Sequence, residues 1–488
     1  MKHDEQAWWH EATFYSIYPL GFCGAPASNP SEPAAVGDEP RERVPRLRAI
    51  TEDLDRIGGL GFTALNLGPL FESDSHGYDT RDYFTLDRRL GSDDDLADLV
   101  RAAHNRGMRV VVDGVYNHVG RGFRAFQRLR EEGAGSEYAS WFADVDFSHD
   151  NRFGDGFVYR GWEGVEELVT LNHSNPVVRD HLLDAAAHAV TRYGVDGIRL
   201  DVAYSLPHDF LDALSARLRE VRPDVWLMGE VIHGDYAAYL APGRLDSVTN
   251  YECYKGLWSS FNDRNLHEIA HSLTRLFGDG GLLCAALEAG KLPFGFADNH
   301  DVTRVASALT TREHLYPLYA LLWTMPGVPS VYYGSEYGME GRKEKADAVL
   351  RPEVAAVHAL ARFEQNASVA RFIGELNRVR ARSRTLREGA YRQVSVASTS
   401  LVFERTLTAR DGGVAPGPDG AADGDRAGGA HRVLVAVNAD ADPATLELPA
   451  EHGGDYRCLF SDEEVALGRS APTLELPAHG VRVLERRS

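Results

Sequence analysis

The stretch VVVDGVYNHVG (110–120) runs from three valines into Asp113, Asn117 and His118, and three more stretches of the chain are built in the same way. They are GVDGIRLDVA (194–203), VWLMGEVIHG (225–234) and FGFADNHDVTR (294–304). A buried strand has no structural reason to end in acids and histidines, because burying charge is costly. In a (β/α)₈ barrel, however, the carboxyl ends of the strands form the active-site face. We therefore expect these four strand ends to meet in one catalytic site.

Apolar strand patterns alternate with helical patterns along most of the chain. Eight segments have the strand pattern: 14–20, 63–69, 108–115, 197–203, 225–231, 245–250, 294–300 and 330–334. Helices are expected at about 46–58, ending before Gly58, and after the N-cap residues Ser92 and Asn175, the latter with Gly194 beyond its last turn. Eight such units favour a parallel sheet closed into a (β/α)₈ TIM barrel. A doubly wound open sheet is the alternative, but no GxGxxG turn follows the first strand.

The alternation is interrupted once and ends before the C-terminus. From Val119 to about Asn172 the chain is rich in Gly, Asp and aromatic residues, and so long a connection is usually a functional insertion. Beyond about residue 385, short strand patterns with turn signals predict an all-β domain. We therefore expect four parts: residues 1–118 and 173–384 as the barrel, 119–172 as an inserted B domain, and 385–488 as a C-terminal β-sandwich with a flexible loop at about 409–430.

Charge and composition restrict the partners of the protein. The formal net charge of −20 argues against nucleic acid or an anionic membrane as the main partner. No apolar run approaches the ~20 residues of a membrane span, and the N-terminal sequence MKHDEQAWWHEATF lacks the pattern of a secretory signal. The four cysteines are scattered without a CxxC spacing, which favours a reducing compartment. A cytoplasmic protein is therefore expected.

Two acids at neighbouring strand ends suggest the chemistry. Hydrolysis of a glycosidic bond needs one carboxylic acid to protonate the leaving oxygen and one carboxylate to attack or stabilise the anomeric carbon. Asp201 lies on the fourth expected strand and Glu230 on the fifth. Arg199 lies two residues before Asp201 on the same strand, so both side chains would point to the same side. The pair predicts a glycosidase.

These stretches closely resemble the motifs of the α-amylase family, glycoside hydrolase family 13. That family has DxxxNH after strand three, GxRxD at strand four, a Glu at strand five and NHD at strand seven, and all four are present here in that order. Four further segments extend the resemblance over about residues 12–380: YSIYP (15–19), HGYD (76–79), LNHSNPVVRD (171–180) and GVPSVYYGSEYG (327–338). The continuation DVAYSLPHDF (201–210) is most similar to cyclomaltodextrinases and neopullulanases, which act on short maltodextrins.

The resemblance implies a role for each acid. Asp201 would be the nucleophile that forms a covalent glycosyl-enzyme, Glu230 the general acid and then base, and Asp301 the carboxylate that holds the sugar 2- and 3-hydroxyls. Substrate contacts are implied for Tyr78, Asp79, His118, Arg199, His233 and His300. Of these, Tyr78 would stack on the apolar face of the sugar.

Supporting residues and ions are less determined. Asp113 and Asn117 would support the site. No cofactor is expected to be required. Because Asn117 is a calcium ligand in many relatives, calcium is the one candidate ion. Arg351 resembles an arginine that some exo-acting relatives use, with an ordinary surface arginine as the simpler interpretation. For Trp162, stacking on an acceptor sugar and core packing are both open.

The expected function is therefore retaining hydrolysis of α-1,4-glucosidic bonds in maltodextrins or cyclodextrins. A transglycosylase of the same family (a glucanotransferase, isomerase or phosphorylase) is the alternative, because the shape of the acceptor site decides whether water or a sugar takes the intermediate. A non-catalytic carbohydrate-binding or scaffold protein is the remote alternative, since such relatives typically lose one of the three carboxylates. The expected partner is an α-glucan oligosaccharide, and a homodimer is an open option.

Overall fold

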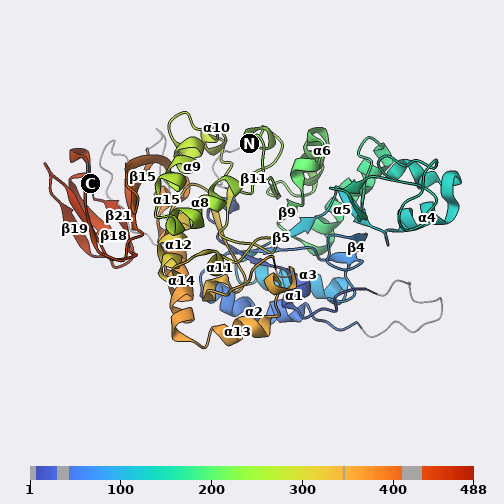
Figure 1. Cartoon of the computed structure of the whole chain (residues 1–488), viewed down its shortest axis with the longest axis horizontal. Coiled ribbons are helices and arrows are strands. Elements are labelled where there is room, and N and C mark those ends of the chain that lie inside the picture. Colours follow the sequence, from blue (N-terminus) through green and yellow to red (C-terminus); the bar gives the residue numbers. More distant parts are fainter. Residues whose placement is uncertain (1–6, 30–42, 345–346, 409–430, 488) are drawn as a thin grey trace.

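The computed structural model describes residues 7–29, 43–344, 347–408 and 431–487. Eight parallel strands form its centre: β1 (Phe14–Ile17), β2 (Ala64–Leu67), β5 (Arg109–Gly114), β9 (Gly197–Leu200), β10 (Trp226–Gly229), β11 (Ser247–Val248), β12 (Phe294–Gly295) and β13 (Val328–Tyr332). Their order is β11-β10-β9-β5-β2-β1-β13-β12 (Figure 1). A parallel bridge between Thr249 and Phe294 joins the two end strands and nearly closes the ring. The predicted (β/α)₈ barrel is confirmed.

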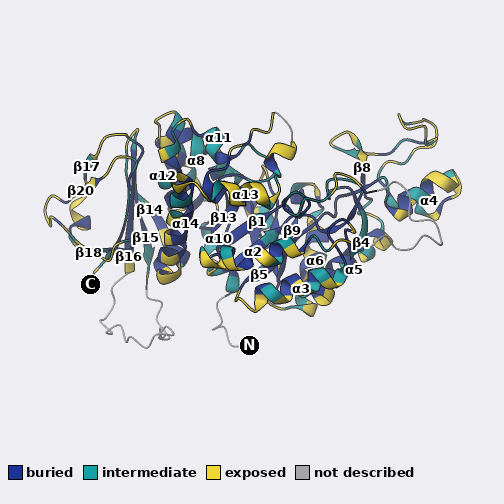
Figure 2. Ribbon diagram, turned by 90° about the horizontal axis from the view of Figure 1, so that it is seen from below, coloured by how far each residue is buried: buried dark blue, intermediate teal, exposed yellow. Residues whose placement is uncertain are grey.

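Helices surround the barrel. They are α1 (Pro19–Phe22), α2 (Arg48–Gly59), α3 (Asp93–His104), α5 (Pro176–Tyr193), α6 (His208–Val221), α7 (Tyr236–Tyr239), α8 (Tyr251–Asn262), α9 (His267–Phe277), α10 (Cys284–Glu288), α11 (Val305–Ala308), α12 (Leu315–Thr324), α13 (Val354–Leu360), α14 (Glu364–Arg382) and α15 (Arg384–Glu388). Most of them expose an outer face and pack an inner face against the barrel (Figure 2). An exception is α12, of which all residues but Tyr316 are buried.

Local sequence signals explain two of these helices. Ser92 and Asp95 form a capping box at the start of α3, in which each side chain satisfies a backbone N–H that the first turn leaves free. Asn175 caps α5 through the Val177 N–H, and Gly194 ends it in the left-handed conformation at φ +76°. Both predictions are confirmed. The end predicted for α2 was too early, because that helix continues through Gly58 to Gly59.

The insertion after β5 forms a small separate unit that extends to one side of the barrel (Figure 1). It contains β6 (His118–Gly120), α4 (Arg124–Glu132), β7 (Gly161–Trp162) and β8 (Val165–Thr170), and its three strands pair in the order β6-β8-β7. A hairpin that the sequence patterns did not predict lies beside it, with strands β3 (Phe71–Ser73) and β4 (Thr80–Leu86). The loop between β3 and β4 carries the HGYD segment.

The C-terminal part is all-β, as predicted. Six antiparallel strands pair in the order β14-β15-β16-β21-β18-β19, and β17 pairs with β20. Their bounds are β14 (Ala390–Val396), β15 (Ser400–Leu407), β16 (His431–Asn438), β17 (Ala444–Glu447), β18 (Gly454–Cys458), β19 (Glu464–Leu467), β20 (Thr473–Leu476) and β21 (Val481–Arg486). One face of the large sheet joins the barrel core, and the other packs on β17 and β20. The flexible loop predicted at 409–430 lies outside the described residues.

Among the described residues, no helix combines the length and apolar character needed to cross a membrane.

Candidate active site

The four predicted strand ends meet at one end of the barrel. Asp113 is the next-to-last residue of β5, Asp201 directly follows β9, and Glu230 directly follows β10. Asp301 lies six residues beyond the short strand β12. Because the barrel strands are parallel, their carboxyl ends share one face.

Arg199 joins three of the acids. Its Nη1 lies 2.6 Å from Asp113 Oδ2 and 3.4 Å from Asp201 Oδ1, and its Nη2 lies 3.0 Å from Glu230 Oε1. All four side chains are buried. Burial alone lowers the pKa of Arg199, but the surrounding carboxylates outweigh it and raise that pKa well above its usual value. The guanidinium is therefore a permanent cation among acids that would otherwise repel one another.

A strained turn directly after Asp201 makes a hydrogen bond to Glu230. Val202 adopts φ +41° and ψ +45°, a left-handed conformation that is unfavourable for a β-branched residue. In this conformation the Val202 N–H donates to Glu230 Oε2 at 3.0 Å. Strain of this kind gathers at functional sites, where the surrounding structure holds it.

Asp201 and Glu230 are electrostatically coupled. Burial, and next the charge of Glu230, raise the pKa of Asp201 well above its usual value, and Arg199 opposes both. Arg199 is the group that favours the ionised form of Asp201 against both effects.

Asp301 is held in the ionised form. His300 Nε2 lies 2.9 Å from its Oδ2, and Arg351 Nη2 lies 3.0 Å from its Oδ1. Burial raises the pKa of Asp301, but the charge and hydrogen bond of His300, followed by the charge of Arg351, outweigh it and hold the pKa far below the usual range. Its side chain is 35% exposed, more than that of Asp201 or Glu230. Asp301 is thus the anion that faces the opening.

Arg351 was recognised in the sequence as a candidate, but its contact with Asp301 was not predicted. Its side chain is 11% exposed, and its guanidinium lies 4.5 Å above the ring of Tyr18. The interpretation as a surface arginine is therefore wrong. Only the folding of the 347–353 segment over the barrel mouth brings Arg351 to Asp301, which is why no local pattern revealed it.

Two of the predicted aromatic contacts lie against each other. The rings of Tyr78 and His300 stack with centroids 5.5 Å apart and planes 6° apart. The Tyr78 hydroxyl donates to Asp113 Oδ2 at 3.1 Å and also contacts His300 Nε2. The ring of Tyr18 stacks on His300 as well, at 5.9 Å. Tyr78 is thereby fixed beside the acids.

His118 presents a free ring nitrogen. Its Nδ1 lies 3.2 Å from Asn117 Nδ2, and its ring stacks on Trp162 at 5.3 Å. Its Nε2 has no hydrogen-bond partner among the described residues. Burial lowers the pKa of His118 to about 3, so the imidazole is neutral and this nitrogen is available to a hydroxyl group.

The remaining predicted contacts lie further from the acids. The carboxylate of Asp79 accepts from the Ser75 hydroxyl and the Gly77 N–H, so it orders its own loop. His233 is exposed, with its ring 5.4 Å from that of Tyr204. The Tyr204 hydroxyl donates to Glu163 Oε1 of the inserted domain at 3.3 Å.

The groove beside Asn117 has two acidic side chains, Asp144 and Glu163, and Glu163 accepts from the Tyr204 hydroxyl. Asp144 pairs with Arg160 at 2.6 Å, and the groove is also lined by Thr170, His173 and Ser205. Calcium takes six to eight oxygen ligands, with carboxylates among them. No group of three or more His, Cys, Asp or Glu side chains in the described part of the chain is placed to hold a metal ion.

A (β/α)₈ barrel that brings three acids and an arginine to its carboxyl face defines a glycosidase of the barrel class. The family model described as "Alpha amylase, catalytic domain" matches residues 33–368. The chain therefore belongs to the α-amylase family, and its enzyme class is that of the glycosidases.

Known proteins of this family resemble the chain over nearly its whole length. A cyclomaltodextrinase of Geobacillus thermopakistaniensis (strain MAS1) is 27% identical, over 97% of this chain and 76% of that protein. A solved structure of a cyclomaltodextrinase superposes with a TM-score of 0.80 at 26% identity, covering 99% of this chain and 79% of that one. A cyclic α-maltosyl-(1→6)-maltose hydrolase of Arthrobacter globiformis superposes with a TM-score of 0.75 at 26% identity, covering 99% and 100%.

Proposed function

We propose that the protein hydrolyses α-1,4-glucosidic bonds of maltodextrins or cyclodextrins and retains the configuration at the anomeric carbon. One observation carries the proposal: a single guanidinium, that of Arg199, contacts both Asp201 and Glu230. The similarity to cyclomaltodextrinases supports the substrate class.

The shared guanidinium supports retention rather than inversion. Retaining glycosidases have their two carboxyl groups about 5–5.5 Å apart, whereas inverting enzymes leave room for a water molecule with a separation of about 6.5–9.5 Å. Asp201 and Glu230 are also linked through the Val202 N–H, which holds them at neighbouring positions. Asp201 can then attack the anomeric carbon directly.

In the first step, an oxygen of Asp201 attacks the anomeric carbon while Glu230 gives its proton to the glycosidic oxygen, and the bond to the leaving sugar breaks. In the second step, Glu230 takes a proton from water, the water oxygen attacks the same carbon, and Asp201 leaves as a carboxylate. Arg199 stabilises the negative charge of Asp201 at the start and the end of the cycle. Each residue is therefore restored after one turnover.

The sugar before the scissile bond would be held by the groups around these acids. The ionised Asp301 accepts hydrogen bonds from its 2- and 3-hydroxyls, and His300 assists. The neutral His118 offers its free Nε2 to a further hydroxyl, and Tyr78 supplies an aromatic face. Contacts that strengthen as the ring distorts lower the barrier, because they stabilise the transition state more than the substrate.

A glycosyl transferase of the same family is the second candidate, and one feature favours it. A cavity of about 640 Å³, within the usual size range of ligand pockets, lies between the inserted domain and the barrel. Trp162, Glu163 and Ser205 line it, and Trp162 stacks on His118. An acceptor sugar bound there would compete with water for the glycosyl-enzyme.

Product analysis tests the proposal. The purified protein is incubated with maltohexaose, β-cyclodextrin, starch, sucrose and trehalose, with and without added glucose, and the products are separated by chromatography. Opened cyclodextrin and shorter maltodextrins alone are the expected result. Longer products, or products that change when glucose is added, would identify the transferase, and no turnover of any of the five would contradict both candidates.

A further inference from the structure

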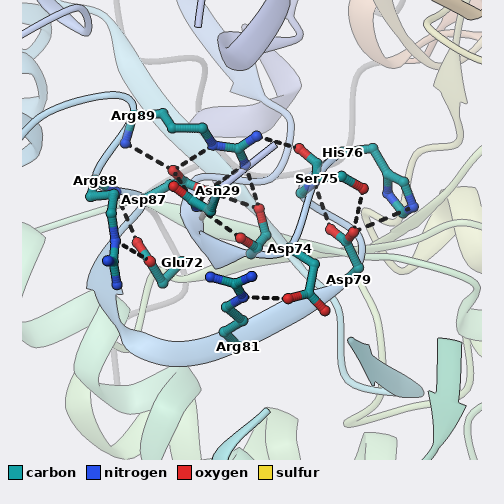
Figure 3. A network of polar contacts seen from close by, with 12 residues as sticks. Asn29, Glu72, Asp74, Ser75, His76, Asp79, Arg81, Asp87, Arg88 and Arg89 are labelled. Atoms are coloured by element: carbon teal, nitrogen blue, oxygen red, sulfur yellow. Dashed lines mark hydrogen bonds and ion pairs between the residues drawn. The ribbon is translucent and has the colours of Figure 1, made fainter. Parts of the chain in front are cut away.

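The buried arginine Arg89 contacts the loop that carries Tyr78. The side chain of Arg89 is 4% exposed, and that of its partner Asp87 is 1% exposed. Arg89 Nε and Nη2 donate to the two oxygens of Asp87 at 2.9 and 2.7 Å. Figure 3 shows this pair in a polar network that also includes Ser75 and Asp79.

Arg89 uses its remaining donors on two other segments. Nη2 also donates to Ser73 Oγ at 2.7 Å, and Nη1 donates to the carbonyl oxygens of Ser75 at 2.6 Å and Pro26 at 3.1 Å. All of its guanidinium nitrogens are therefore engaged. A planar fork of donors makes such a set of contacts possible, and a lysine cannot reproduce it.

The Ser75 carbonyl is the point through which Arg89 reaches the loop. The Ser75 hydroxyl donates to Asp79 Oδ2, and the Asp74 N–H donates to the Asp79 carbonyl at 2.9 Å. These bonds close residues 74–79 into one compact turn, with Tyr78 inside it. Gly77 adopts φ +89°, and a Cβ there would lie 2.6 Å from Pro69 Cγ, so the turn also has little room to shift.

The charges of the pair keep the anchor rigid. Burial raises the pKa of Asp87, but the hydrogen bonds and charge of Arg89 outweigh it and hold that pKa below its usual value. Both partners are thus ionised, and an ionised pair that satisfies its hydrogen bonds in a buried place permits few alternative arrangements.

We propose that Arg89 is a positioning residue for the reaction, which sets the place of Tyr78 against the sugar by clamping the Ser75 carbonyl to Asp87. This proposal rests on the proposed function, in which Tyr78 contacts the sugar. Arg89 itself does not touch the substrate and acts through the 74–79 turn.

A double-mutant cycle tests the proposal, because it separates an effect that passes through Tyr78 from a general loss of structure. Arg89→Lys, Tyr78→Ala and the double variant are compared with the wild type in kcat and KM on the best substrate of the panel above. We expect Arg89→Lys to lower kcat/KM about 10- to 100-fold when Tyr78 is present, and less than about 3-fold when it is absent. Equal losses in both backgrounds would overturn the proposal.

A matched control lies at the other end of the barrel. Arg380 is also a buried arginine, and it donates to the carbonyl oxygens of Trp323 at 3.0 Å and Gly327 at 2.6 Å. Arg380→Lys should lower the thermal midpoint and leave KM unchanged. If Arg89→Lys reduces kcat/KM no more than Arg380→Lys does, Arg89 has only a structural role.

A milder variant covers the case in which Arg89→Lys does not fold. Ser73→Ala removes one acceptor of Arg89 and leaves the ion pair in place, and we expect a 2- to 5-fold loss of kcat/KM that again vanishes in the Tyr78→Ala background. An additive loss would overturn the proposal. A wild type inactive on every substrate overturns the proposed function and this proposal with it, whereas an active wild type with additive variants overturns the role of Arg89 alone.

Discussion

Arg351 Nη2 lies 3.0 Å from Asp301 Oδ1, on the side of Asp301 opposite the oxygen that His300 contacts. The two residues are separated by 50 positions in the chain. Asp301 is thus held from both sides, by the imidazole of His300 and the guanidinium of Arg351, and its carboxylate plane is fixed while part of it remains exposed. An anion held in this way is ready to accept hydrogen bonds from a sugar without first reorganising.

Removing Arg351 should therefore disorder Asp301. We expect Arg351→Ala to lower kcat/KM on maltohexaose about 10- to 100-fold, which corresponds to about 1.4–2.8 kcal/mol of lost transition-state stabilisation. Arg351→Lys keeps the charge and should lose less. The measurement is kcat/KM of the two variants on maltohexaose by steady-state kinetics. An alanine variant as active as the wild type would show that Asp301 does not depend on Arg351.

The acid limb of the pH profile should move when Glu230 is neutralised. The negative charge of Glu230 raises the pKa of Asp201, so its replacement by glutamine lowers that pKa, and Asp201 remains an ionised nucleophile at lower pH. We expect the acid limb of kcat/KM for Glu230→Gln to lie at lower pH than that of the wild type. The measurement follows fluoride release from α-maltosyl fluoride in a single turnover, because this leaving group needs no acid and its release precedes the step that the variant blocks. An unmoved or raised limb contradicts the coupling.

Glu163 should influence the choice between water and a sugar. Its contact with the Tyr204 hydroxyl joins the inserted domain to the barrel beside the acceptor cavity. If the products change when glucose is added, as the transferase candidate requires, Glu163→Ala should open this wall to water and reduce the ratio of transfer products to hydrolysis products about 2- to 5-fold. Glu167→Ala is the matched control, because Glu167 is an exposed acid of the same domain that pairs with Arg152. Equal ratios of transfer to hydrolysis products in the two variants would contradict a role of Glu163 in the choice of acceptor.

Chelation of divalent metal should leave the protein unchanged. The groove beside Asn117 lacks a set of free carboxylates, and only a ligand that binds the folded state raises its stability. We expect EDTA to change neither the thermal midpoint nor the activity. A lower midpoint in EDTA that added calcium restores would show that an ion is bound.

Most of the barrel could be predicted because its strands are apolar and its helices have local start signals. All eight expected segments overlap a strand. Seven of these strands are shorter than expected, since the loops begin where the functional residues stand: β12 has two residues, although the apolar pattern continues to Ala297. The eighth, β13, has the expected length but begins two residues earlier, at Val328. The hairpin of β3 and β4 was missed because its three- and seven-residue strands have irregular pairing.

The acids of the site could be predicted from their positions at strand ends, but their partners could not. Arg199 and Asp201 are two residues apart on one strand, and this spacing alone placed them together. Arg351 and Arg89 reach the site through the folding of distant loops, and no periodicity records such contacts. The left-handed conformation of Val202 was equally invisible, because a valine does not favour it.

The covalent step is the central claim, and trapping it is the most direct test. In Glu230→Gln, α-maltosyl fluoride should still transfer its maltosyl group to the nucleophile with loss of fluoride, while the glutamine cannot activate water to release it. We predict that mass spectrometry of the digested protein finds one maltosyl group in ester linkage on Asp201. An adduct on Asp113 or Asp301 instead, or no adduct together with release of β-maltose, would contradict the account.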